Sequence, residues 1–231
     1  MKAIKDKLLD ILLFPVKFYE KITDKKGTLY AGILLVGAID LLLPDIMGIF
    51  EQLFKSGPSE NNFFNAFMLP VAIVLTGAVD VICIGLPLYD FFNFLKKKEI
   101  GYIGHESDVG IERELPPDKS GGIQYTATAI KTMKIYVMSH FLIIPVNTLL
   151  HYVFFSKIGE NPPVWVANLA LAYFMLVFIW AAAIMARGIN TLFRFNPIFK
   201  RLTFIIIFAW NFLFGMVFDM QIMNWITRLF R

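Results

Sequence analysis

The chain has 231 residues, of which 57% are hydrophobic and only 17% are charged, and its mean hydropathy is +0.63. Soluble globular domains carry about 25% charged residues, and here the charges gather in short clusters between long apolar stretches. This composition excludes an ordinary soluble domain and predicts an all-α, polytopic transmembrane helical bundle. The net charge of +4 comes mostly from basic clusters beside the apolar stretches, so no nucleic acid is expected as a partner.

Residues 1–28 form a basic segment whose apolar side chains fall near helical spacing. These side chains are Ile4, Leu8, Leu12, Tyr19 and Ile22. They predict an N-terminal amphipathic helix that lies in the lipid headgroup region and bends near Pro15. Asp10, Pro15 and Lys17 interrupt the apolar stretch and no small-residue cleavage site follows, so a cleavable signal peptide is not expected.

Five apolar runs follow, and they predict five membrane spans. The runs cover residues 29–50, 66–95, 123–155, 162–187 and 202–227. A bilayer core requires about 20 apolar residues per helix. The second and third runs are longer, so we expect them to tilt or to kink at Pro70, Pro87 or Pro145.

Polar segments separate the runs and contain no second domain. Residues 51–65 and 156–163 read as turns rich in Gly, Pro and Asn. Residues 96–122 are expected to form a cytoplasmic loop with a small β-hairpin around Tyr102 and Ile111. This loop is too short to bury a core of its own. Residues 1–231 therefore count as a single integral membrane domain.

The distribution of basic residues predicts the orientation. Eighteen of the 22 Lys and Arg residues lie in residues 1–28, 96–134 and 187–201. Because cytoplasmic loops are rich in Lys and Arg, we expect a cytoplasmic N-terminus and an external C-terminus in the cell membrane. The basic fringe, which includes Lys96–Lys98, also predicts contact with anionic lipid at the cytoplasmic face.

Two of the apolar runs carry the same short pattern, "GAID" at Gly37–Asp40 and "GAVD" at Gly77–Asp80. Each Asp lies near the middle of its predicted span, where a carboxylate costs about 3 kcal/mol or more. Each Gly precedes its Asp by three residues, close to the same helix face, and allows close helix packing. The pattern predicts antiparallel helices that bring the two acids to the same depth. Carboxylates that close would not both stay ionised, so the pair could hold a proton or a cation, or could bond other helices structurally.

A polar stripe runs along the predicted span 123–155. Its members are Tyr136, His140, Asn147 and His151, at spacings of four, seven and four. Such a stripe must face the bundle interior or a water-filled cavity, where His140 could meet Asp40 or Asp80. A proton relay and a metal site are the functional interpretations. The two histidines are about 16 Å apart along a helix and cannot share one ion. Structural hydrogen bonding is therefore favoured, and no metal or other cofactor is expected.

Familiar enzyme motifs are absent. The sequence contains no H-E-x-x-H zinc motif, nucleophile elbow, Walker loop or dinucleotide fingerprint. This argues against an enzyme but leaves a membrane-embedded enzyme of unfamiliar kind as a third alternative. The single Cys83 lies in an apolar run, so it forms no intrachain disulfide and implies no oxidising compartment.

The N-terminal stretch "ILLFPVKFYEKI" is similar to the Leu-Phe-x-Pro-x-x-Phe-Phe entry common in bacterial members of the Yip1 family of five-span membrane proteins. The expected topology, five spans with a cytoplasmic N-terminus, also resembles that family. The stretch "DLLLPD", Asp40–Asp45, is weakly similar to the family's "DLYGP" signature. The resemblance implies a non-enzymatic bacterial membrane protein that acts through helix packing, membrane lipids and protein partners, either other membrane proteins or copies of itself, in membrane organisation or trafficking. It transfers no functional residue. The alternative is a small proton- or cation-coupled transporter or channel that uses Asp40, Asp80 and His140.

Overall fold

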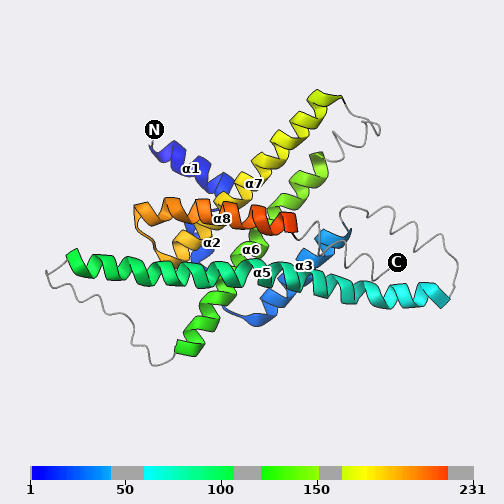
Figure 1. Ribbon diagram of the computed structural model, residues 1–231, viewed down its shortest axis with the longest axis horizontal. Helices are drawn as coiled ribbons and strands as arrows, with labels where there is room; N and C mark the ends of the chain where they lie inside the picture. The colour runs from blue at the N-terminus through cyan, green and yellow to red at the C-terminus, as the bar shows by residue number, and fades with distance from the viewer. Residues whose placement is uncertain (1, 43–59, 107–120, 151–162, 218–231) are drawn as a thin grey trace.

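The computed structural model describes residues 2–42, 60–106, 121–150 and 163–217 (Figure 1). Every secondary-structure element in these residues is a helix, which confirms the all-α class for this part of the chain. The helices are α1 (Lys2–Leu13), α2 (Val16–Glu20), α3 (Lys26–Leu42), α5 (Glu60–Glu106), α6 (Gly121–Leu150), α7 (Val164–Phe193) and α8 (Pro197–Val217).

Three of the described helices are long and apolar enough to cross a membrane. The segments are Pro70–Ile100 in α5, Val164–Phe193 in α7 and Pro197–Gly215 in α8. Large apolar side chains on α7 and α8 face outward, with Leu176 63% and Leu213 61% exposed. The predicted spans at 29–50 and 123–155 continue into residues outside the described part, so a total of five spans stays a prediction.

The N-terminal segment forms two helices that pack on α7. Phe14 adopts a positive φ of 60° and Pro15 an extended conformation, and together they separate α1 from α2. The indole nitrogen of Trp180 on α7 donates to the carbonyl oxygen of Leu12 at 2.7 Å. The bend near Pro15 is therefore confirmed as a full break. A position in the headgroup region stays a prediction.

α5 begins earlier than the predicted span 66–95. Residues 60–65 are helical although they belong to the turn predicted at 51–65, whose other residues lie outside the described part. Pro70 and Pro87 lie inside this helix of 47 residues, and Figure 1 shows α5 as one continuous ribbon across the molecule. The prolines therefore do not end the helix.

α5 also ends later than predicted, which corrects the loop at 96–122. The helix continues through Tyr102 to Glu106, so the β-hairpin expected around Tyr102 is wrong there, and Ile111 lies outside the described residues. Lys96 and Glu99 form an ion pair of 2.6 Å at i,i+3 spacing, which favours continued helix. The polar residues that follow the apolar run therefore continue α5 and do not end it.

The buried core joins α3, α5, α6 and α7. Val36, Val81, Ile135 and Ile189 are at most 1% exposed and contribute one side chain from each of these helices. Figure 1 shows α6 crossing α5 obliquely and α7 running in a similar direction to α6. The polar residues described below lie among these apolar contacts.

Candidate functional site

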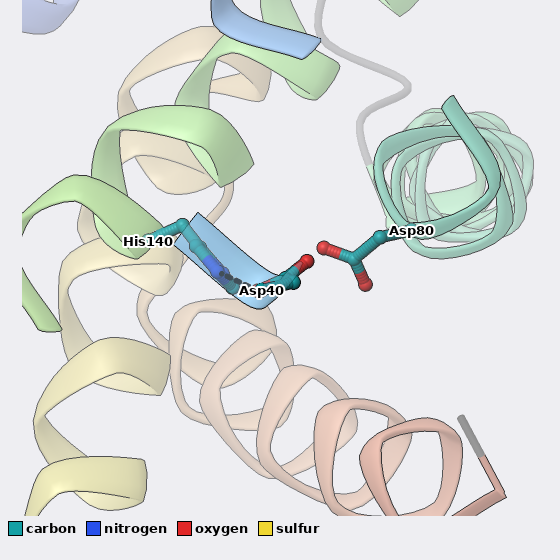
Figure 2. A group of neighbouring side chains, drawn as sticks. All are labelled: Asp40, Asp80 and His140. Atoms are coloured by element: carbon teal, nitrogen blue, oxygen red, sulfur yellow. Dashed lines mark hydrogen bonds and ion pairs between the residues drawn. The ribbon is translucent and has the colours of Figure 1, made fainter. Parts of the chain in front are cut away.

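Three titratable side chains from three different helices meet beside the core. Asp40 comes from α3, Asp80 from α5 and His140 from α6, and one ligand atom from each lies within 4.8 Å of the other two. Figure 2 shows a carboxylate oxygen of Asp80 pointing toward Asp40, while the His140 ring approaches Asp40 from another side. The structure thus brings together the three residues that the sequence singled out.

The approach of the two acids depends on the glycines that precede them. A Cβ at Gly37 would overlap the carbonyl oxygen of Ile73 and would lie 2.7 Å from the backbone nitrogen of Gly77. A Cβ at Gly77 would likewise overlap the carbonyl oxygen of Ile33 and lie 2.7 Å from the nitrogen of Gly37. This reciprocal pattern is that of antiparallel helices in backbone contact. Any larger residue would push α3 and α5 apart, and the two carboxylates with them.

A chain of hydrogen bonds links the three residues through Tyr136. The Tyr136 hydroxyl donates to Oδ2 of Asp80 at 2.5 Å, and its oxygen lies 3.4 Å from Nδ1 of His140. Nε2 of His140 lies 2.8 Å from Oδ1 of Asp40. Because the single hydroxyl proton of Tyr136 goes to Asp80, its oxygen is an acceptor toward His140, which places a hydrogen on Nδ1. Tyr136 therefore orients both the carboxylate and the imidazole.

Among the described residues, one oxygen of this cluster has no hydrogen-bond partner. Oδ2 of Asp40 is buried and no described residue donates to it. Leaving a buried acceptor unpaired costs about 1–3 kcal/mol, and more for a charged group. Asp80 is 4% exposed, and the side chains of Asp40 and His140 are 15% and 19% exposed. The site is therefore largely shielded from solvent, is negatively charged when both acids are ionised, and lacks one hydrogen-bond donor among the described residues.

The rest of the predicted stripe is not brought to the site by the described structure. Asn147 belongs to α6, but its side chain lies outside the described residues, as does His151 entirely. The bond from Tyr136 to Asp80 was not predicted, although Tyr136 lies one turn before His140 on the same face. Thr76, one turn before Asp80, is also buried with no hydrogen-bond partner among the described residues.

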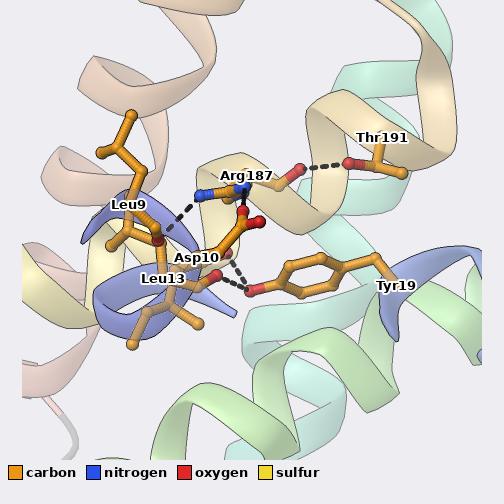
Figure 3. A network of polar contacts seen from close by, with 7 residues as sticks. Leu9, Asp10, Leu13, Tyr19, Arg187 and Thr191 are labelled. Carbon is orange, nitrogen blue, oxygen red and sulfur yellow. Dashed lines mark hydrogen bonds and ion pairs between the residues drawn. The ribbon is translucent and has the colours of Figure 1, made fainter. Parts of the chain in front are cut away.

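A second polar cluster joins the N-terminal segment to α7 (Figure 3). Arg187 donates to the carbonyl oxygen of Leu9 at 2.8 Å and forms an ion pair with Asp10. The buried hydroxyl of Tyr19 lies 2.9 Å from the carbonyl oxygen of Leu13 and 3.1 Å from that of Ile184. Burial raises the pKa of Tyr19, which favours its neutral, donating form. All these bonds stay within the protein, so this cluster serves to attach the N-terminal helices.

A third cluster holds α5 against the turn between α7 and α8. Glu99 is 1% exposed and accepts from Lys96 at 2.6 Å and from the backbone nitrogen of Asn196 at 2.6 Å. Lys96 also donates to the carbonyl oxygen of Arg194 at 3.2 Å, where Arg194 ends α7 with a positive φ of 51°. The sequence pointed to these lysines only as a lipid-facing fringe. The sequence feature that could have indicated this cluster is a single acid, Glu99, directly after three lysines.

Comparisons of the chain with known family models, curated proteins and solved structures give no match. The resemblance to the Yip1 family therefore stays a prediction. The chemistry of the site itself is therefore the guide to its function.

Proposed function

We propose that this protein is an integral membrane protein that binds and transfers a small cation, a proton or a metal ion, between α3, α5 and α6. The observation that carries this proposal is Oδ2 of Asp40, a buried acceptor without a partner among the described residues, beside the carboxylate of Asp80. Acids in the apolar part of a membrane protein are functional-site candidates by default, and in many membrane proteins they mark ion pathways. A cation between the two carboxylates would offset their repulsion and complete the coordination of Asp40.

The proposal includes a topology. Five spans, a cytoplasmic N-terminus and an external C-terminus fit the clustering of Lys and Arg, and they make this a protein of the cell membrane. In that arrangement Asp40 and Asp80 lie near the middle of the bilayer. A cation held there would be equally distant from both faces, as a transfer site requires.

Flux through reconstituted liposomes tests the proposal. Wild type should show pH-driven or metal-driven cation flux, and Asp40→Asn and Asp80→Asn should each reduce it at least tenfold, because each removes one of the two charges. Asp90→Asn is the matched control, since Asp90 lies on the same helix as Asp80 but is exposed. Absence of flux in folded wild-type protein, or equal flux in all four proteins, would refute a cation-transfer role.

A second function is a packing scaffold of the Yip1-like kind, in which the acids and His140 only bond helices together. The observation in its favour is the mutual backbone contact of Gly37 and Gly77, which already fixes α3 against α5. Under this alternative, Asp40→Asn and Asp80→Asn would lower thermal stability, and neither wild type nor variant would carry flux. Protein partners, a second copy included, would then bind through the exposed faces of α7 and α8.

Anionic phospholipid is the partner proposed for the basic side of the molecule. A cleft between α2, α7 and α8 is lined by Arg187, Arg194 and Lys200, with Phe204 and Glu20 also on its walls. Cationic groups above an apolar surface suit a phosphate headgroup with its acyl chains. Native mass spectrometry should detect retained phosphatidylglycerol on wild type and markedly less on Arg194→Gln/Lys200→Gln. Equal retention would argue against this cleft.

A further inference from the structure

We infer that the site formed by Asp40, Asp80 and His140 binds one divalent transition-metal ion. This inference rests on the proposed cation-handling function and names the cation. Its starting point is geometric: two carboxylates and one imidazole from three helices converge with ligand atoms within 4.8 Å of one another. His140 and His151 are too far apart to share an ion, but this site does not need both histidines because its other ligands come from neighbouring helices.

The distances suit a transition-metal ion after a small closure. Zinc-like ions bind oxygen and nitrogen at about 2.0–2.2 Å in tetrahedral geometry, so two ligand atoms of one ion are about 3.4 Å apart. The three ligand atoms lie within 4.8 Å of one another, so the most distant pair would have to close by at most about 1.4 Å. The 2.8 Å between His140 and Asp40 is already close to the separation of adjacent ligands. Rotation of carboxylates about their side-chain bonds is sufficient for this change.

The ligand types and the charge both favour a doubly charged transition metal. Mixed nitrogen and oxygen donors suit Zn²⁺, Mn²⁺, Fe²⁺ or Co²⁺, whereas Mg²⁺ and Ca²⁺ prefer oxygen donors alone and larger coordination shells. With an ion bound at Nε2 in place of its hydrogen, two carboxylates and a neutral imidazole carry a charge of −2, which an ion of charge +2 cancels. A monovalent ion would leave an unbalanced charge in a site largely shielded from solvent.

The surroundings of the three ligands are those of a prepared metal site. Metal-bound histidine usually donates through its other ring nitrogen, and here the Tyr136 oxygen accepts from Nδ1 of His140. An ion at Nε2 would replace the present hydrogen bond between Nε2 and Oδ1 of Asp40. The same tyrosine holds Oδ2 of Asp80, so one residue orients two ligands. Oδ2 of Asp40 and the fully buried hydroxyl of Thr76 have no hydrogen-bond partner within the described part of the chain, and they are oxygen ligands on the two acid-bearing helices. The partial exposure of Asp40 and His140 leaves a route of entry.

Metal titration of the full chain tests the inference. Purified protein in detergent or nanodiscs is stripped with a chelator and titrated with Co²⁺, whose visible absorption reports coordination, and with Zn²⁺ by calorimetry. We expect one equivalent to bind. Asp40→Asn, Asp80→Asn and His140→Gln should weaken binding at least about 100-fold, and Tyr136→Phe about 10-fold as an outer-shell change. Asp90→Asn should bind as wild type does.

The outcomes separate this inference from the proposed function. Folded protein that binds neither ion at millimolar concentration, or that binds both without regard to the ligand substitutions, overturns the metal site. If proton flux in liposomes persists in that case, the cation-transfer proposal stands and only the identity of the cation is wrong. If a ligand substitution prevents folding, the variants Tyr136→Phe and Asp40→Glu still test the metal site. Co²⁺ spectra and Co²⁺ affinity that stay unchanged in both variants would contradict metal coordination at this site.

Discussion

Two buried carboxylates of this protein differ in how completely they are bonded. Both oxygens of Glu99 have a partner, one from Lys96 and one from the backbone of Asn196. Asp40 has His140 on one oxygen and no described donor on the other. Glu99 lies where α5 meets the turn between α7 and α8, whereas Asp40 lies where α3, α5 and α6 meet.

The difference separates structural from functional polar groups. A buried charge whose bonds close on protein groups restricts the fold to one arrangement, and removing a partner leaves the other uncompensated. The cluster of Arg187, Asp10 and Tyr19 follows the same rule as Glu99. A buried acceptor without a partner contributes nothing to the fold and lowers its stability until a ligand binds. Substitutions in the two kinds of cluster should therefore have opposite effects on stability and activity.

The largest effect is expected from Gly77→Ala, because an added Cβ would overlap the backbone of α3. The helices must separate, and overpacking of this kind costs about 1–3 kcal/mol, or more where backbone rather than a side chain must move. Both thermal stability and metal binding should fall. Gly27→Ala is the control, since no atom lies within 4 Å of the added group. Equal melting temperatures for the two variants would contradict the glycine contact.

Arg187→Ala should have the next largest effect. It leaves Asp10 and the carbonyl oxygen of Leu9 without their partner, for a loss of about 1–3 kcal/mol. Because Asp10 is partly exposed, the lower end of this range is expected. Thermal unfolding in detergent measures the loss, and limited proteolysis should show release of α1. Cation flux per folded molecule should not change, so a selective loss of flux would show that the N-terminal cluster is not merely structural.

A smaller effect is expected from Tyr19→Phe, about 0.5–1.5 kcal/mol for one hydrogen bond. The folded state raises the pKa of Tyr19 above its ordinary value of 10.0, so its contribution is complete below pH 10 and declines as the pH rises above that value. The stability difference between wild type and Tyr19→Phe should therefore shrink between pH 8 and pH 11. A difference that grows over this range would have the wrong sign.

The smallest effect on stability is expected from Asp40→Asn in the absence of metal, within about 1 kcal/mol of wild type and in the direction of greater stability. The substitution removes an incompletely bonded charge. Glu99→Gln is the matched change at the fully bonded carboxylate, and it should be clearly destabilising. If Asp40→Asn destabilises the apo protein as much as Glu99→Gln does, Asp40 is a structural residue and the contrast between the two clusters fails.

Several features were predictable because they depend on local sequence alone. The helical class follows from composition, and the break near Pro15 from the fixed φ of proline and its missing donor. The pairing of Asp40 with Asp80 followed from two copies of one pattern, since a glycine three residues before an acid places both on one helix face. Helix ends were less predictable. α5 extends beyond the predicted span at both ends, and at its C-terminal end the ion pair of Lys96 with Glu99 supports the polar part of the helix.

The amino-acid sequence by itself determined the apolar helices, the glycines that permit close approach and the choice of Asp40, Asp80 and His140 as unusual residues. These follow from side-chain chemistry and helical periodicity. Only the tertiary structure decided that Tyr136 bonds Asp80 and that Asp40 keeps an open oxygen, whereas Glu99 does not. Hydrogen-bond saturation depends on which groups of distant segments come within about 3 Å, a matter of packing that no local pattern encodes.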